Sequence, residues 1–119
     1  MNFLSYLATI AIIIAVDLPW LMLGSKTSKS MILSIQGSEL VLRWFPALVV
    51  YFALAYLAHL PTSNIEAFLL GLCVYAVYDF TNYATLKNYS LKFAIMDSLW
   101  GGVLFLIVFN ILKYFKLSL

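Results

Sequence analysis

The chain has 119 residues, of which 65% are hydrophobic and only 10% are charged, whereas about a quarter of the residues in a typical soluble domain are charged. This composition excludes an ordinary soluble domain. The formal net charge is +2, and no basic run or glycine-rich loop indicates a nucleic-acid or nucleotide partner. One cysteine and one histidine exclude an intrachain disulfide and argue against a zinc or haem site, so we expect neither a metal nor a cofactor.

Four apolar segments can each span a bilayer, which requires about 20 mostly apolar residues. We place them at about residues 2–24, 40–60, 65–86 and 91–114. The first segment starts without Lys or Arg and is longer than the apolar region of a signal peptide, so we expect a retained helix. The sequence therefore predicts an all-α, integral membrane four-helix transmembrane bundle, with residues 1–119 forming one domain.

The connections differ in length and polarity. Residues 25–39 form a polar connection, inside which the apolar run 31–35 is too short to span and should lie at the interface or against the bundle. The turn before the third helix offers Ser63 or Asn64 as a cap, and Glu66 suits the positive end of that helix. Residues 87–90 form a short turn.

Basic residues near the helix ends predict the orientation, because they favour the cytoplasmic side. The first and third connections carry Lys26, Lys29, Arg43, Lys87 and Lys92, and the other side carries Lys113 and Lys116. This bias predicts a multi-pass membrane protein with both termini outside the cytoplasm. A bias of this size also fits a dimer whose subunits insert in opposite orientations.

Three aspartates lie inside apolar segments: Asp17, Asp79 and Asp97. An ionisable side chain at the centre of a spanning helix costs about 2.5–3.5 kcal/mol on insertion scales, so such residues usually face a bundle interior or a watery cavity. Counting along each helix places all three roughly 9–11 Å from the membrane face that carries the basic connections. Arg43 enters from the same face.

Aromatic and polar residues accompany these carboxylates at helical spacing. The pattern Asp-x-x-Trp occurs twice, as Asp17 with Trp20 and as Asp97 with Trp100. The third helix carries Tyr75, Tyr78 and Asn82 around Asp79. Carboxylates among such aromatic side chains can form a cage for a cation or a polar head group.

Two prolines lie in the same half of the predicted bundle. Pro19 should free the carbonyl of Ala15, and Pro46 that of Leu42. A freed carbonyl inside a membrane needs a partner or a wet cavity, and broken helices beside charged residues occur at transport sites.

Small residues predict where helices approach closely. Ala11 and Ala15 lie four apart, as do Ala67 and Gly71, and Gly101 with Gly102 opens a surface on the fourth helix.

Several interpretations of the polar residues stay open. Three carboxylates in a low dielectric cannot all remain ionised cheaply, so Arg43 and a lysine compensate them or at least one carries a proton. The aspartates could instead act as interhelical hydrogen-bond acceptors. Trp20 and Trp100 could belong to the interfacial aromatic belt, Lys87 could be an ordinary anchor at the membrane face, and Arg43 could point outward to the head groups.

Over essentially its whole length, and most specifically in its C-terminal half, the chain resembles a family of small predicted membrane proteins with domain of unknown function 2177. The matching residues are Gly71, Tyr78, Asp79, Thr81, Asn82, Ala84, Thr85, Leu86, Lys87, Asp97, Trp100 and Gly101, and the Asp17–Trp20 element matches the end of the family's first helix. The resemblance implies a four-helix membrane protein with a polar site shared by the first, third and fourth helices. It implies no activity, substrate or cofactor.

The leading hypothesis is a small transporter or channel-like protein, whose carboxylate cluster binds a cation, a proton or a small cationic solute. Membrane lipids and further copies of the chain are the expected partners, because so small a bundle has little room for a full permeation path. A membrane-embedded enzyme or lipid-binding protein is the alternative, with Asp79 and Asp97 acting on a head group and Lys87 or Arg43 holding its phosphate. A third hypothesis is a structural subunit of a larger membrane complex.

Overall fold

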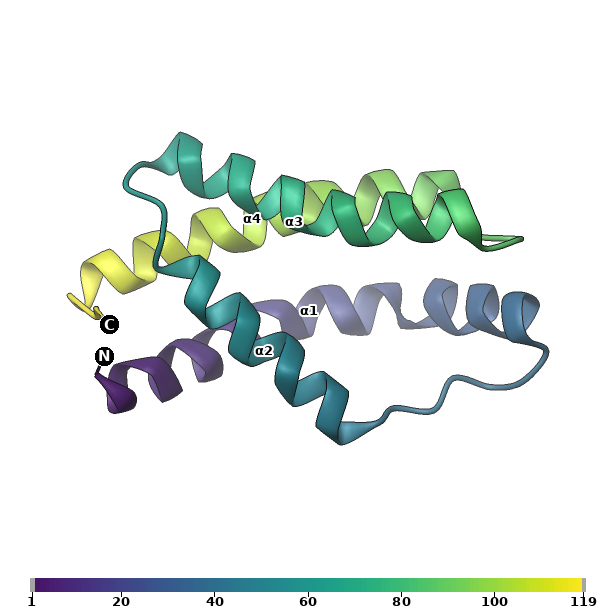
Figure 1. Cartoon of the computed structure of the whole chain (residues 1–119), viewed down its shortest axis with the longest axis horizontal. Coiled ribbons are helices and arrows are strands. Elements are labelled where there is room, and N and C mark those ends of the chain that lie inside the picture. Colours follow the sequence, from purple (N-terminus) through teal and green to yellow (C-terminus); the bar gives the residue numbers. More distant parts are fainter. Residues whose placement is uncertain (1, 119) are drawn as a thin grey trace.

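The computed structural model describes residues 2–118, and all its regular structure is helical. The helices are α1 (Phe3–Gln36), α2 (Trp44–Ala58), α3 (Asn64–Thr85) and α4 (Leu91–Tyr114). Figure 1 shows an elongated bundle in which α3 and α4 run side by side and α2 crosses obliquely. The all-α helical bundle predicted from the sequence is confirmed.

The two ends of the bundle are formed by different segments of the chain. The chain termini lie together at one end, while the end of α1 and the turn between α3 and α4 lie at the other (Figure 1). The first and third connections therefore share an end, as the sequence predicted, and this end carries most of the basic residues.

The first helix is longer than predicted, because α1 continues through the expected polar connection to Gln36 and has 34 residues. Its last turns are held against the rest of the bundle by Met31, which is buried against Tyr89 and Ala94. Gly37 ends the helix in the left-handed conformation (φ 74°), and its backbone N–H donates to the Leu33 carbonyl at 2.9 Å. Tertiary packing thus outweighs the lower helix propensity of the serine and threonine residues in this stretch.

The second helix is shorter than predicted, because α2 begins at Trp44 and has only 15 residues. Residues 39–43 precede it without regular structure. Pro46 therefore lies in the first turn of α2, and the expectation that it frees an intrahelical carbonyl of Leu42 is wrong, because Leu42 lies before the helix. Pro19 does lie inside α1, as expected.

The caps of α3 and α4 follow directly from their sequences. The Ser63 side chain accepts from the Glu66 backbone N–H, and Ser90 accepts in the same way from Phe93. The Glu66 carboxylate in turn accepts from the Thr62 backbone N–H at 3.0 Å. These bonds satisfy helix-end donors that would otherwise lack partners.

The closest helix packing joins α3 to α4 and depends on glycine. A Cβ placed on Gly71 would lie 2.1 Å from the Gly101 carbonyl oxygen, and one on Gly101 would lie 2.3 Å from the Tyr75 ring. Ala67 is fully buried at the same interface, so both predicted small-residue surfaces on these helices pack within the chain. Ala11 and Ala15 are instead exposed on α1.

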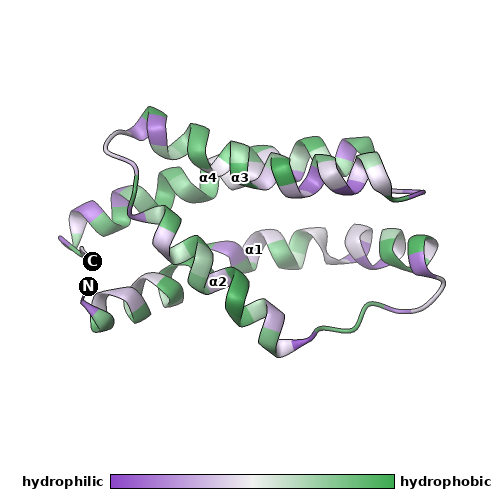
Figure 2. Cartoon of the chain, viewed as in Figure 1, coloured by the Kyte–Doolittle hydropathy of each residue, from purple (hydrophilic) through white to green (hydrophobic). Residues whose placement is uncertain are grey.

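Apolar side chains cover much of the outer surface. Leu23, Trp44 and Val77 are 81%, 74% and 70% exposed. Figure 2 shows hydrophobic residues along the length of every helix. Within residues 2–118, α1, α3 and α4 are long and apolar enough to cross a membrane, whereas α2 is apolar but shorter. The exposed surface is therefore suited to lipid.

Candidate functional site

Asp17 is held by donors from two other helices. Its side chain is 5% exposed. The Trp100 indole N–H of α4 donates to Oδ1 at 2.8 Å, and the Tyr51 hydroxyl of α2 donates to Oδ2 at 3.0 Å. Both carboxylate oxygens therefore have a hydrogen-bond partner, and three helices meet at this side chain.

Asp97 completes a reciprocal arrangement between α1 and α4. The Trp20 indole N–H donates to Asp97 Oδ1 at 2.8 Å, while Trp100 donates back to Asp17. The two indole rings lie parallel, with centroids 5.8 Å apart and an interplanar angle of 17°. Each Asp-x-x-Trp element thus supplies the acceptor for the other element's donor. We call these four residues, Asp17, Trp20, Asp97 and Trp100, the Asp–Trp clamp.

Asp79 is the most deeply buried of the three acids and has no exposed surface. The Tyr89 hydroxyl donates to its Oδ1 at 2.7 Å, and Oδ2 is buried without a hydrogen-bond partner among the described residues. Asp97 lies close enough across the α3–α4 interface for the two carboxyl groups to interact. Burial, together with the bond to Asp79, raises the pKa of the Tyr89 hydroxyl, which therefore remains a donor at neutral pH.

A cavity of about 730 Å³ opens beside the clamp. Asp17, Trp20 and Asp97 contribute to its wall, as do Tyr75, Tyr78 and Asn82 of α3. Most of the remaining lining is aliphatic or aromatic, from α1, α2, α3 and α4 and from Leu40 in the segment before α2. This volume lies within the range of typical small-molecule sites, roughly 300–1,000 Å³.

Comparison with known proteins shows that a family model described as "Predicted membrane protein (DUF2177)" matches residues 2–111. The chain belongs to this family. No curated protein and no solved structure matches it. The family resemblance drawn from the sequence is therefore confirmed, and so is its placement among membrane proteins.

The acidic and tryptophan residues that carried the family resemblance lie at the site. Both Asp-x-x-Trp elements form the clamp, and Asp79 lies next to it. The three acids do share a region of the bundle, as the count along the helices predicted. The indole N–H groups of Trp20 and Trp100 are directed to carboxylates, so these residues do more than line an interfacial belt.

The two basic residues predicted to belong to the site, Arg43 and Lys87, lie away from the carboxylates. Arg43 is the exposed residue preceding α2, and Lys87 is exposed in the turn after α3. Neither contributes to the cavity wall, so the structure gives no support to the alternative in which Arg43 and a lysine compensate the acids. The physical reason is the late start of α2, which leaves Arg43 outside the bundle. Tyr78 borders the cavity but is 64% exposed.

Sequence reasoning missed two tyrosines that hold the acids. Tyr51 comes from α2, and Tyr89 comes from the turn before α4. Tyr89 directly precedes the Ser90 cap, a position that gave no signal for a bond back into α3. Among residues 2–118, no group of three or more His, Cys, Asp and Glu side chains is arranged to hold a metal ion.

Proposed function

We propose that this membrane protein binds an amphipathic organic cation in the 730 Å³ cavity, with the Asp97 carboxylate as the charged anchor, and that it carries such cations or protons across the membrane. The observation that carries the proposal is the charge of the cavity wall. Its lining contains two carboxylates and no Lys, Arg or His side chain. A buried carboxylate without a counter-charge is costly, and a bound cation or a proton would remove that cost.

Asp97 is a better anchor than Asp17 because its carboxylate can accept more additional hydrogen bonds. Both oxygens of Asp17 already accept hydrogen bonds, whereas Asp97 accepts one bond from Trp20, to Oδ1. An ionised carboxylate can accept about four hydrogen bonds. Asp97 can therefore take an additional cationic partner without breaking the Asp–Trp clamp.

The rest of the wall suits the apolar body of such a solute. Trp20, Tyr75 and Tyr89 present aromatic rings, and Leu21, Leu54 and Leu57 add aliphatic surface. A cation over an aromatic face gains about 0.5–2 kcal/mol, more when it is removed from water. A ligand with one positive charge and several rings or alkyl groups would match both features.

Proton exchange follows from the proximity of Asp79 and Asp97. Two neighbouring carboxyl groups in a low dielectric share a proton more cheaply than they carry two charges. The Asp79 Oδ2 atom, buried without a partner, is the natural position for that proton. A cation arriving at Asp97 would lower the cost of a second negative charge on the pair, so its binding would favour release of the proton from Asp79.

The alternative of a head-group enzyme has less support. It required Lys87 or Arg43 to hold a phosphate beside the Asp pair, and both side chains lie outside the cavity lining. A role as a structural subunit has no specific observation in its favour. We retain homo-oligomerisation as part of the proposal, because so small a bundle has little room for a complete permeation path.

The test is equilibrium dialysis of tetraphenylphosphonium against the purified protein in a non-ionic detergent. We expect saturable binding that Asp97→Asn weakens by about tenfold or more, because the substitution removes the negative charge that attracts the cation. Asparagine retains an oxygen that accepts from Trp20, so the clamp and the fold should persist. Ethidium uptake into proteoliposomes with an imposed pH gradient then tests transport.

Glu39→Gln is the matched control, because Glu39 is exposed and outside the cavity lining. It removes one negative charge at the same end of the bundle and should leave binding unchanged. Equal loss in the two variants would indicate a general charge effect and contradict the proposal. Absence of saturable binding by the folded native protein would also refute it.

A further inference from the structure

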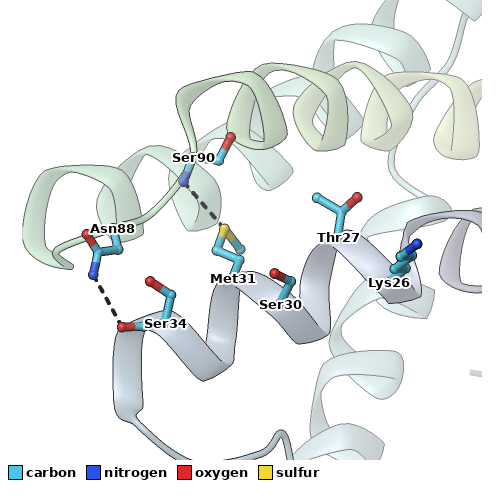
Figure 3. Close-up of a pocket in the computed structure, with 7 residues that line it drawn as sticks. All are labelled: Lys26, Thr27, Ser30, Met31, Ser34, Asn88 and Ser90. Atoms are coloured by element: carbon cyan, nitrogen blue, oxygen red, sulfur yellow. Dashed lines mark hydrogen bonds between the residues drawn. The ribbon is translucent and has the colours of Figure 1, made fainter.

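A second, polar pocket of about 440 Å³ lies between the last turns of α1 and the turn that joins α3 to α4. Figure 3 shows its residues on these two segments, with Lys26 at the end of the row that is farthest from the turn. They are Lys26, Thr27, Ser30, Met31, Ser34, Asn88 and Ser90. Five of the seven carry a hydroxyl or amide group, and none is acidic, so this pocket is opposite in charge to the larger cavity.

The α1 side of the pocket is built by helical spacing. Lys26, Ser30 and Ser34 are four residues apart in turn, so they lie along one face of α1. This face exists only because α1 continues past the first apolar segment. It presents one ammonium group and two hydroxyls to the same space.

The other side is built by the turn, and hydrogen bonds hold it in place. Asn88 adopts the left-handed conformation (φ 69°), and its side-chain amide donates to the Ser34 carbonyl at 3.2 Å. The Ser90 backbone N–H faces the Met31 sulfur at 3.4 Å. Thioether sulfur is a weak acceptor, so this N–H can still donate to a stronger one.

The position of the pocket indicates the kind of ligand. Because α3 and α4 have 22 and 24 residues, each is long enough to cross a bilayer, and their connecting turn lies at head-group level. Lys29, Lys87 and Lys92 are exposed at this end of the chain and add positive charge. Basic residues at the membrane surface attract anionic lipids.

We propose that this pocket binds the phosphate group of an anionic glycerophospholipid, with Lys26 as the charged partner and Ser30, Ser34 and the Ser90 N–H as additional donors. Leu91, directly after Ser90, is 45% exposed and offers apolar surface where an acyl chain would begin. The site is independent of the cation site, because only Met31 contributes to both linings.

The experiment is native mass spectrometry of the detergent-solubilised full chain, titrated with phosphatidylglycerol or with diacylglycerol of the same acyl chains. We expect preferential binding of phosphatidylglycerol, weakened about tenfold by Lys26→Gln. Lys29→Gln is the matched control, since Lys29 is an exposed lysine on the same helix that does not line the pocket. It should change binding by about twofold or less, because distant surface charge is screened.

A further variant, Ser30→Leu, fills the pocket without changing its charge and should weaken binding as Lys26→Gln does. Equal effects of Lys26→Gln and Lys29→Gln, or equal binding of the two lipids, would overturn the site. Displacement of the lipid by an equal concentration of inorganic phosphate would overturn the lipid assignment and identify free phosphate as the ligand.

Discussion

The indole N–H groups of Trp20 and Trp100 are the donors on which the clamp depends. Each is partly buried and directed to a carboxylate on the other helix, at 2.8 Å in both cases. A hydrogen bond to a charged group contributes about 1.5–3 kcal/mol, and a buried acceptor left unpaired is costly. The clamp should therefore be sensitive to loss of a single donor even when the ring remains.

Trp100→Phe tests the contribution of a single donor to the clamp. Phenylalanine retains an aromatic ring against Trp20 but lacks the N–H that binds Asp17. We expect a loss of about 1–3 kcal/mol in the free energy of unfolding, measured by denaturation in detergent. Trp44→Phe is the control, since Trp44 is 74% exposed at the start of α2. If both variants lose the same stability, the bond to Asp17 is not what holds α1 to α4.

At the scale of elements, α3 and α4 pack against each other more extensively than any other pair of helices. The packing of α1 and α2 onto this pair is less extensive. Backbone contact at Gly71 and Gly101 brings α3 and α4 together along their length. This proximity places Asp79 of α3 next to Asp97 of α4. The short α2 covers only part of the bundle, which is consistent with a large cavity beside α1 and α3.

Gly71→Ala should separate α3 from α4, because the new Cβ would lie 2.1 Å from the Gly101 carbonyl oxygen. We expect a destabilisation of about 1–3 kcal/mol, as for other overpacking changes, seen as a lower midpoint of unfolding.

Gly24→Ala should change the free energy of unfolding in the opposite direction. Gly24 lies within α1 with nothing near the added Cβ, so alanine should stabilise the helix by about 1 kcal/mol. A loss of stability in Gly24→Ala, or none in Gly71→Ala, would contradict this account.

At the scale of the whole molecule, the bundle has extents of 45 × 28 × 22 Å and separates two kinds of chemistry along its length. Carboxylates lie inside, beside an apolar cavity, and lysines gather at the end formed by the tail of α1 and the α3–α4 turn. An outer surface of exposed apolar side chains surrounds both. The two ligands that we propose, an organic cation and a lipid phosphate, would therefore bind at different places in the molecule.

The arrangement predicts which positions share a side of the membrane. In a Cys73→Ser background, Asn2→Cys and Ser118→Cys should react with an impermeant maleimide from one side, and Lys29→Cys and Lys87→Cys from the other. From the distribution of basic residues we expect the second pair to face the cytoplasm. Labelling of Asn2→Cys and Ser118→Cys from opposite sides would contradict the arrangement in Figure 1. Labelling of every position from both sides would indicate dual topology.

The sequence by itself determined the helical class, the family, most helix boundaries and the common region of the three acids. These properties are local: hydropathy locates apolar helices, Ser63 and Ser90 mark helix starts, and the rise per residue sets depth. Gly37 was also a readable stop signal for the longer α1, because left-handed glycine commonly ends a helix.

Only the tertiary structure decided which donor meets which acid, that Arg43 stays outside and that the tail of α1 packs on the turn. The physical reason is that spacing along one helix defines a face but not the partner opposite it. Trp20 lies one turn from Asp17 yet donates to Asp97, since the choice depends on how α1 is rotated and shifted against α4. That rotation and shift result from packing across the whole bundle, to which residues distant in sequence contribute.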